Sequence, residues 1–166
     1  MSYLSRKLKN FGPLEFLLIS SFAYVIIMLI WTASTRSAVV QKANDMKFNH
    51  KTVVEFINNE VNECSSNENG KTTWGEKCNS AWTSSNIVKY ILDNFKLNNP
   101  YKIEKPLIQT SQDPRIQAEG KAGQSTNKGI IFVSENNFES EAGSEWIIGT
   151  CIKSPCVAAG NNELVS

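Results

Sequence analysis

The chain has 166 residues, and its 17 basic and 16 acidic side chains give a formal net charge of +1. This length has room for a membrane segment and one modest folded domain, but not for two such domains. The near-zero charge gives no argument for a nucleic-acid-binding surface, so we expect no specific nucleic-acid partner.

An unbroken apolar run covers residues 16–33 and follows a short leader that contains Arg6, Lys7 and Lys9. About 20 apolar residues span a bilayer, whereas the core of a secretory signal peptide has about 7 to 15. The run therefore predicts a membrane helix that stays with the protein. Because the basic residues precede it, the positive-inside rule predicts a cytoplasmic amino end and an exported remainder.

The helix is expected to continue beyond the membrane, because no Pro or Gly interrupts the chain from Leu14 to Glu63. At 1.5 Å per residue, a single helix of about 50 residues would be about 75 Å long. Its second half has apolar residues at steps of three and four, which predicts one buried stripe. That stripe consists of Val39, Ala43, Met46, His50, Val53, Val54, Ile57, Val61 and Cys64. A break near Ser34 and Thr35, with an ordinary helix after it, is the alternative.

The rest of the chain predicts short elements. A polar stretch at residues 65–71 predicts a loop, and a shorter helix is expected from Ser80 or Thr83 through Phe95. Its buried face is expected to contain Trp82, Ile87, Val88, Ile91, Leu92 and Phe95. Strands are predicted at residues 115–119, 129–133 and 145–150, with a turn at 123–128, a connection at 138–144 and little signal in the tail, 157–166. Helices followed by strands predict an α+β fold, with a small antiparallel sheet packed on the second half of the long helix.

The four cysteines all lie in the part of the chain that is expected to be exported. The most economical pairing joins Cys64 to Cys78 and Cys151 to Cys156, which closes two short loops. A zinc site of four thiolates is the alternative, but neither spacing is that of a typical zinc knuckle. Because an exported domain meets an oxidising environment, we expect disulfides and no bound metal.

We find no pattern that predicts an enzyme. The only histidine, His50, lies on the apolar stripe of the long helix, where a packed core residue is more frequent than a catalyst. The segment 120–126 lacks the residue order of a phosphate-binding loop. We therefore expect neither catalytic residues nor a cofactor.

Glu15 stands at the beginning of the apolar run. A carboxylate within a membrane span costs several kcal/mol unless it is paired or reaches the interface, which makes Glu15 a candidate functional residue. The alternative is a position at the cytoplasmic interface, where an acid beside Pro13 suits the start of a helix.

The order of these features resembles the type IV pilin superfamily. The resemblance rests on the basic leader, the segment Phe11-Gly-Pro-Leu-Glu15-Phe-Leu-Leu, the apolar helix, its amphipathic continuation, the small sheet and the C-terminal disulfide loop. It implies that a prepilin peptidase removes the leader, so that the mature chain starts with a hydrophobic residue and has Glu at its fifth position. Cleavage between Asn10 and Phe11 gives this arrangement. Cleavage after Gly12 is the alternative, although it leaves a proline first and Glu15 third.

The resemblance also implies the organisation and function of the chain. Residues 1–10 would be the leader, residues 11–34 the membrane and filament-core helix, and residues 35–166 the exported domain. The chain would lie in the inner membrane before assembly. Copies of it would then be assembled by the pilus machinery into a cell-surface filament, in which Glu15 meets the new α-amino group of another subunit. The alternative function is a single-span membrane protein that does not assemble and whose exported domain binds a ligand or partner.

Overall fold

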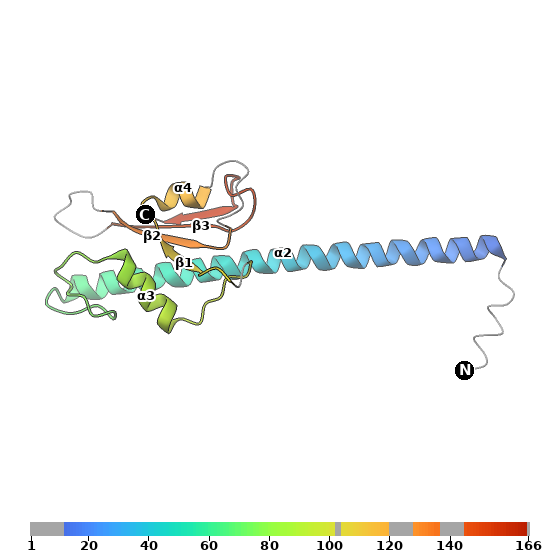
Figure 1. Ribbon diagram of the computed structural model, residues 1–166. Helices are drawn as coiled ribbons and strands as arrows, with labels where there is room; N and C mark the ends of the chain where they lie inside the picture. Colours follow the sequence, from blue (N-terminus) through green and yellow to red (C-terminus); the bar gives the residue numbers. More distant parts are fainter. Residues whose placement is uncertain (1–11, 102–103, 120–127, 137–144, 166) are drawn as a thin grey trace, which may run out of the picture. The chain divides into compact units, whose positions relative to one another are not determined.

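The computed structural model describes residues 12–101, 104–119, 128–136 and 145–165. In chain order, the elements are α2 (Pro13–Ser66), α3 (Ser84–Asn94), β1 (Ile108–Thr110), α4 (Pro114–Glu119), β2 (Ile131–Asn136), β3 (Glu145–Cys151) and β4 (Asn162–Val165) (Figure 1). The fold is therefore α+β. The chain divides into two compact units, Met1–Gln41 and Lys42–Ser166.

Helix α2 confirms the expectation of one long helix. Its 54 residues include Ser34 and Thr35, so the break considered from the sequence is absent. The Thr35 hydroxyl donates to the carbonyl oxygens of Trp31 and Thr32, at 3.0 and 3.1 Å. A hydroxyl that bonds back to the preceding turn is compatible with continued helix.

The part of α2 in the second unit packs through the predicted stripe. Its buried residues are Met46, Asn49, His50, Val53, Ile57, Glu60 and Cys64. Five of them were expected, whereas the buried polar residues Asn49 and Glu60 were not. Val39 was expected on the stripe but is exposed.

The sheet has the order β1-β2-β3-β4 and is mixed. Strands β2 and β3 are antiparallel, as are β3 and β4, but β1 runs parallel to β2. The expectation of a purely antiparallel sheet was therefore wrong. Parallel neighbours need a crossover connection, and α4 lies in the segment that connects β1 to β2.

Residues 115–119 were expected to form a strand but belong to α4. Asp113 explains the difference, because its Oδ1 accepts hydrogen bonds from the backbone N–H groups of Arg115 and Ile116, at 2.9 and 3.2 Å. An acidic N-cap followed by Pro114 at the first helical position is a strong helix start.

The other expected elements agree in part. Helix α3 and strand β3 confirm two of them, while β2 begins two residues later than expected and β4 lies in the tail where little was expected. Leu92 of α3 is exposed rather than buried. The predicted turn at 123–128, apart from Lys128, and the connection at 138–144 lie outside the described residues.

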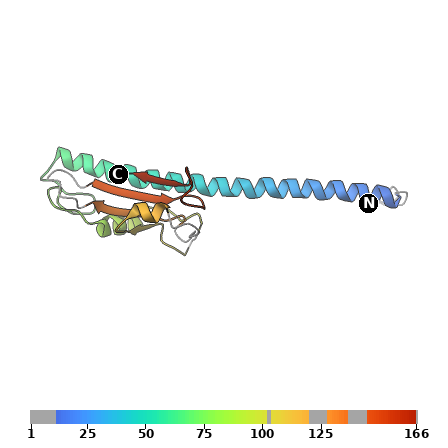
Figure 2. The same cartoon turned by 90° about the horizontal axis from the view of Figure 1, so that it is seen from above.

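Helix α4 covers the sheet face opposite to α3 and the second part of α2 (Figure 1). Gly149 of β3 permits this close approach, because a Cβ atom there would lie 2.4 Å from the carbonyl oxygen of Pro114 and 2.9 Å from Cβ of Ala118. At the edge of the sheet, β4 lies beside α2, where Nζ of Lys47 is 3.4 Å from Oε1 of Glu163 (Figure 2).

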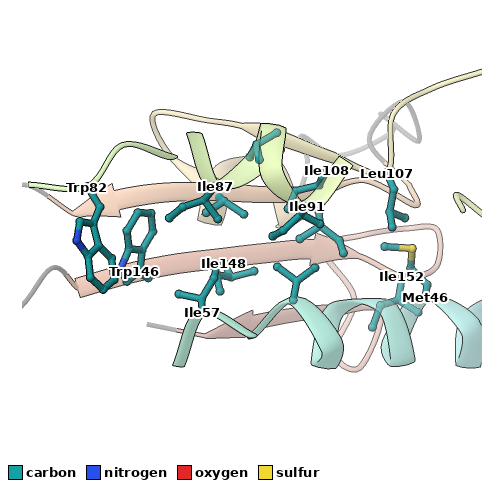
Figure 3. Packing of buried hydrophobic residues seen from close by; sticks show 14 of the residues in the cluster. Met46, Ile57, Trp82, Ile87, Ile91, Leu107, Ile108, Trp146, Ile148 and Ile152 are labelled. Carbon is teal, nitrogen blue, oxygen red and sulfur yellow. The ribbon is translucent and has the colours of Figure 1, made fainter. Parts of the chain in front are cut away.

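The core fills the space between α2, α3 and the sheet. Figure 3 shows Met46 and Ile57 of α2, Ile87 and Ile91 of α3, and Ile148 of β3 gathered in one cluster. All five are at most 2% exposed. Full burial of one such side chain stabilises the folded state by about 1.5–3 kcal/mol, so this cluster holds the two helices on the sheet.

Candidate assembly site

The first turn of α2 places Glu15 against the residue before the helix. The Glu15 carboxylate, through Oε2, accepts a hydrogen bond of 3.1 Å from the backbone N–H of Gly12. The Gly12 carbonyl oxygen in turn accepts from the N–H groups of Glu15 and Phe16. Gly12 is thus the N-cap and Pro13 the first helical residue. A carboxylate at the third helical position that reaches back to the N-cap amide forms one half of a capping box.

Two of the four residues implied by the pilin resemblance, Asn10 and Phe11, lie outside the described residues. The structure places the other two, Gly12 and Glu15, in direct contact. The Glu15 side chain is exposed. Its carboxylate is therefore accessible to a further cationic partner while it caps the helix.

Between Phe16 and Trp31, large apolar side chains are exposed around the surface of α2. Among its exposed large side chains, Phe16 is 67% exposed and Trp31 65%. The others between these two are Leu17, Leu18, Ile19, Phe22, Tyr24, Val25, Ile26, Ile27, Met28, Leu29 and Ile30. By length and composition, α2 is the one helix of the described residues that could cross a membrane. This feature favours membrane association.

The hydroxyl groups on this surface bond to the helix itself. Ser20 donates to the carbonyl oxygen of Leu17 at 3.0 Å, Ser21 to that of Leu18 at 2.8 Å, and Thr32 to that of Leu29 at 3.0 Å. A buried hydroxyl without a partner is costly, and these bonds remove that cost in a lipid or protein environment. The helix surface can therefore be covered by apolar groups.

All four cysteines are in disulfide bonds, Cys64–Cys78 and Cys151–Cys156. The pairing expected from the sequence is thus present, and the zinc alternative is wrong because no thiolate is free. Elsewhere in the described ranges, no group of three or more His, Cys, Asp or Glu residues could hold a metal ion.

The loop closed by Cys64 and Cys78 is also anchored by carboxylates, which sequence reasoning missed. The buried Glu60 accepts hydrogen bonds from the backbone N–H and the hydroxyl of Thr73. Trp74 of the same loop packs on Phe56, with ring centroids 5.9 Å apart. Glu60 follows Ile57 by three residues and so lies on the buried stripe of α2. This position of an acid could have predicted a buried carboxylate.

Glu76 connects that loop to the start of α3. Its carboxylate accepts hydrogen bonds from Nε1 of Trp74 at 2.6 Å and from Nδ2 of Asn86 at 2.7 Å, and it also accepts from Thr83. Burial alone would raise the pKa of Glu76, but these hydrogen bonds together lower it below its ordinary value. Thr83 is the N-cap residue of α3, but its hydroxyl donates to Glu76 and makes no capping bond to the helix.

The C-terminal loop is held by two asparagines, Asn161 just before β4 and Asn162 at its start. Nδ2 of Asn161 donates to the carbonyl oxygen of Pro155 at 2.9 Å, and Nδ2 of Asn162 donates to that of Cys156 at 2.6 Å. Together with the Cys151–Cys156 bond, these contacts fix the loop on the edge of the sheet.

Comparisons of the chain with protein-family models, with curated proteins and with solved structures found no match. The described residues define an α+β protein with one long N-terminal apolar helix, a small mixed sheet and two disulfide-closed loops.

Proposed function

We propose that this chain is the structural subunit of a type IV pilus or a similar filament and that it assembles with copies of itself. The observation that carries the proposal is the continuous helix α2, which is apolar and exposed over one membrane length and then forms the core of the second unit. We propose no enzymatic activity for it.

The apolar surface requires a covering partner. Contiguous exposed apolar patches larger than a few hundred Å² are rare on soluble monomers and mark contact with membranes or other proteins. Lipid could cover the helix before assembly, and the same helix of other subunits could cover it in the filament. Since both environments are apolar, transfer between them involves little loss of hydrophobic free energy.

Glu15 would set the position of each subunit along the filament. Removal of the leader after Asn10 creates an α-amino group on Phe11, which is cationic at neutral pH because its ordinary pKa is about 8. The exposed Glu15 carboxylate of a second copy can neutralise this charge where the helices pack. An unpaired charge among apolar helices would be costly, so the pair would favour one register.

The mature amino terminus tests this proposal. The native protein would be recovered from membranes and from filaments sheared from the cell surface, and its first residues would be sequenced. We expect a form that begins at Phe11 in the sheared fraction, and a start at Pro13 would identify the other cleavage position. A chain that stays full length in the membrane and never reaches the sheared fraction would contradict the filament proposal.

The same experiment addresses the alternative, a single-span membrane protein with an exported binding domain. Such a protein would remain in the membrane fraction with its leader attached. Its partner would be found by cross-linking through the second unit, and variants of the apolar helix that still insert would not affect that binding.

A further inference from the structure

His50 is buried where α2 contacts β3, an inner strand of the sheet. It is the only histidine of the chain. Its side chain is 5% exposed, and its Nδ1 lies 2.8 Å from Oγ1 of Thr150, which is fully buried. Its other ring nitrogen, Nε2, is buried and has no hydrogen-bond partner among the described residues.

The surroundings of His50 connect it to the edge strand β4. Thr150 of β3 pairs with Glu163 of β4 on one side and with Ile131 of β2 on the other. Glu163 is half-exposed and forms an ion pair with Lys47, one turn before His50 on α2. The adjacent Lys51 pairs with Glu55 on the exposed side of the helix.

Protonation of this imidazole would be unfavourable while β4 is paired with β3, an arrangement that we call the closed state. A second ring N–H would appear at Nε2, where the described residues provide no acceptor, and the positive charge would be buried. Burial accordingly lowers the pKa of His50, and the negative charge of Glu163 offsets this effect only in part.

The direction of the pH effect follows from linkage. An opened state binds a proton at the ordinary pKa of 6.5, whereas the closed state binds it only at lower pH. The closed state therefore has its full stability above pH 6.5. It loses stability as the pH falls from there through the lowered pKa.

The element beside Thr150 that can open without breaking the rest of the sheet is β4. It is an edge strand of four residues, β3 is its one neighbour in the sheet, and its last two residues are exposed. Opening β4 would admit water to the imidazole while the other strands keep their pairing.

We propose that His50 is an acid-sensitive latch whose protonation separates the edge strand β4 from α2 and β3. Cys151 is the last residue of β3, so the loop that it closes with Cys156 stays with the sheet, and the separation would break the bonds of Asn161 and Asn162 to this loop. This inference concerns the second unit alone and does not depend on filament assembly.

Amide hydrogen exchange of the full chain in detergent micelles tests the latch. NMR would follow the amides of residues 162–165, with Ile87 and Ile91 of α3 as internal references, at about pH 7.5 and about pH 5.0. After correction for the intrinsic exchange rate, we expect protection of β4 to fall by roughly tenfold at the lower pH and that of α3 to stay constant. His50→Gln should remove the fall, whereas Glu163→Gln should retain it.

Equal protection of wild-type β4 at both pH values would overturn the proposal. The same fall in His50→Gln would overturn it as well, because another group would then be responsible. If that variant does not fold, the titration of His50 in the wild-type protein still tests the proposal. Its single histidine gives one Cε1–H signal, and a signal that titrates at the ordinary pKa without loss of β4 protection would contradict the latch.

Discussion

The buried carboxylate of Glu60 accepts hydrogen bonds from both the backbone N–H and the hydroxyl of Thr73. One residue on α2 thus satisfies two donors of the loop that the Cys64–Cys78 bond closes. The covalent bond fixes the ends of this loop, whereas Glu60 fixes its middle.

We expect Glu60→Ala to destabilise the second unit by about 1–3 kcal/mol, because it leaves donors of Thr73 without their acceptor. Glu63→Ala, at an exposed position on the same helix, is the matched control and should change stability by less than about 0.5 kcal/mol. Thermal unfolding of the full chain in micelles, followed by tryptophan fluorescence, measures both. Equal midpoints for the two variants would show that the Glu60 contact contributes nothing.

The contact between Gly149 and α4 gives a second prediction. Gly149→Ala would place a Cβ atom 2.4 Å from the carbonyl oxygen of Pro114, and backbone must move to relieve the overlap. We expect a loss of about 1–3 kcal/mol. Gly160→Ala provides the comparison, since a Cβ there meets nothing within 4 Å and the loss comes only from its φ of 77°. That loss should be about 1 kcal/mol. Comparable urea midpoints for Gly149→Ala and wild type would contradict the close approach.

Glu76 should contribute to acid sensitivity. Because hydrogen bonds lower its pKa in the folded state, its stabilising effect is present above the ordinary value of 4.5 and is lost as the pH falls through the lowered value. We expect Glu76→Gln to reduce stability at neutral pH and to flatten the dependence of the unfolding midpoint on pH below about 4.5. Glu68→Gln, at an exposed position of the same loop, is the control. If the unfolding midpoint of Glu76→Gln depends on acid pH as strongly as that of the wild type, other carboxylates are responsible for this dependence.

Two substitutions separate the possible roles of Glu15. Glu15→Ala removes both the charge and the acceptor for the Gly12 N–H, while Glu15→Gln removes the charge and keeps an acceptor. We expect both variants to insert in the membrane and both to yield several-fold less sheared filament than wild type, because the proposed role of Glu15 requires its charge. Wild-type amounts of filament from Glu15→Gln would instead assign Glu15 to helix capping.

The sequence predicted the parts of the fold that depend on local periodicity. The three-and-four spacing from Met46 to Cys64 identified the buried stripe, and the residues of β3 identified a strand. The sequence-based prediction failed where a short segment fits both the pattern of a strand and that of a helix. Ile116 and Ala118 alternate with polar residues as in a strand, but the cap from Asp113 and the crossover to β2 decide for a helix.

The contacts on which the two proposals rest were predictable from the sequence only where the residues are neighbours in sequence. Gly12 and Glu15 are three residues apart, so an interaction at the helix start could be expected. His50 and Thr150 are 100 residues apart, and their contact depends on which strand lies against α2. Strand β4 escaped notice for a related reason, because four residues give too short an alternation to identify.

The bonds that Ser20, Ser21 and Thr32 make to their own helix limit how a neighbouring helix can recognise this surface. Their donors are already used, so between Phe16 and Thr32 the side chains that can still donate are Tyr24 and Trp31. A neighbour that slides by one helical turn, about 5.4 Å, would give up few hydrogen bonds along the way. In the proposed filament, the axial position of each subunit would therefore depend on apolar packing and on the Glu15 pair rather than on hydrogen bonds along the helix.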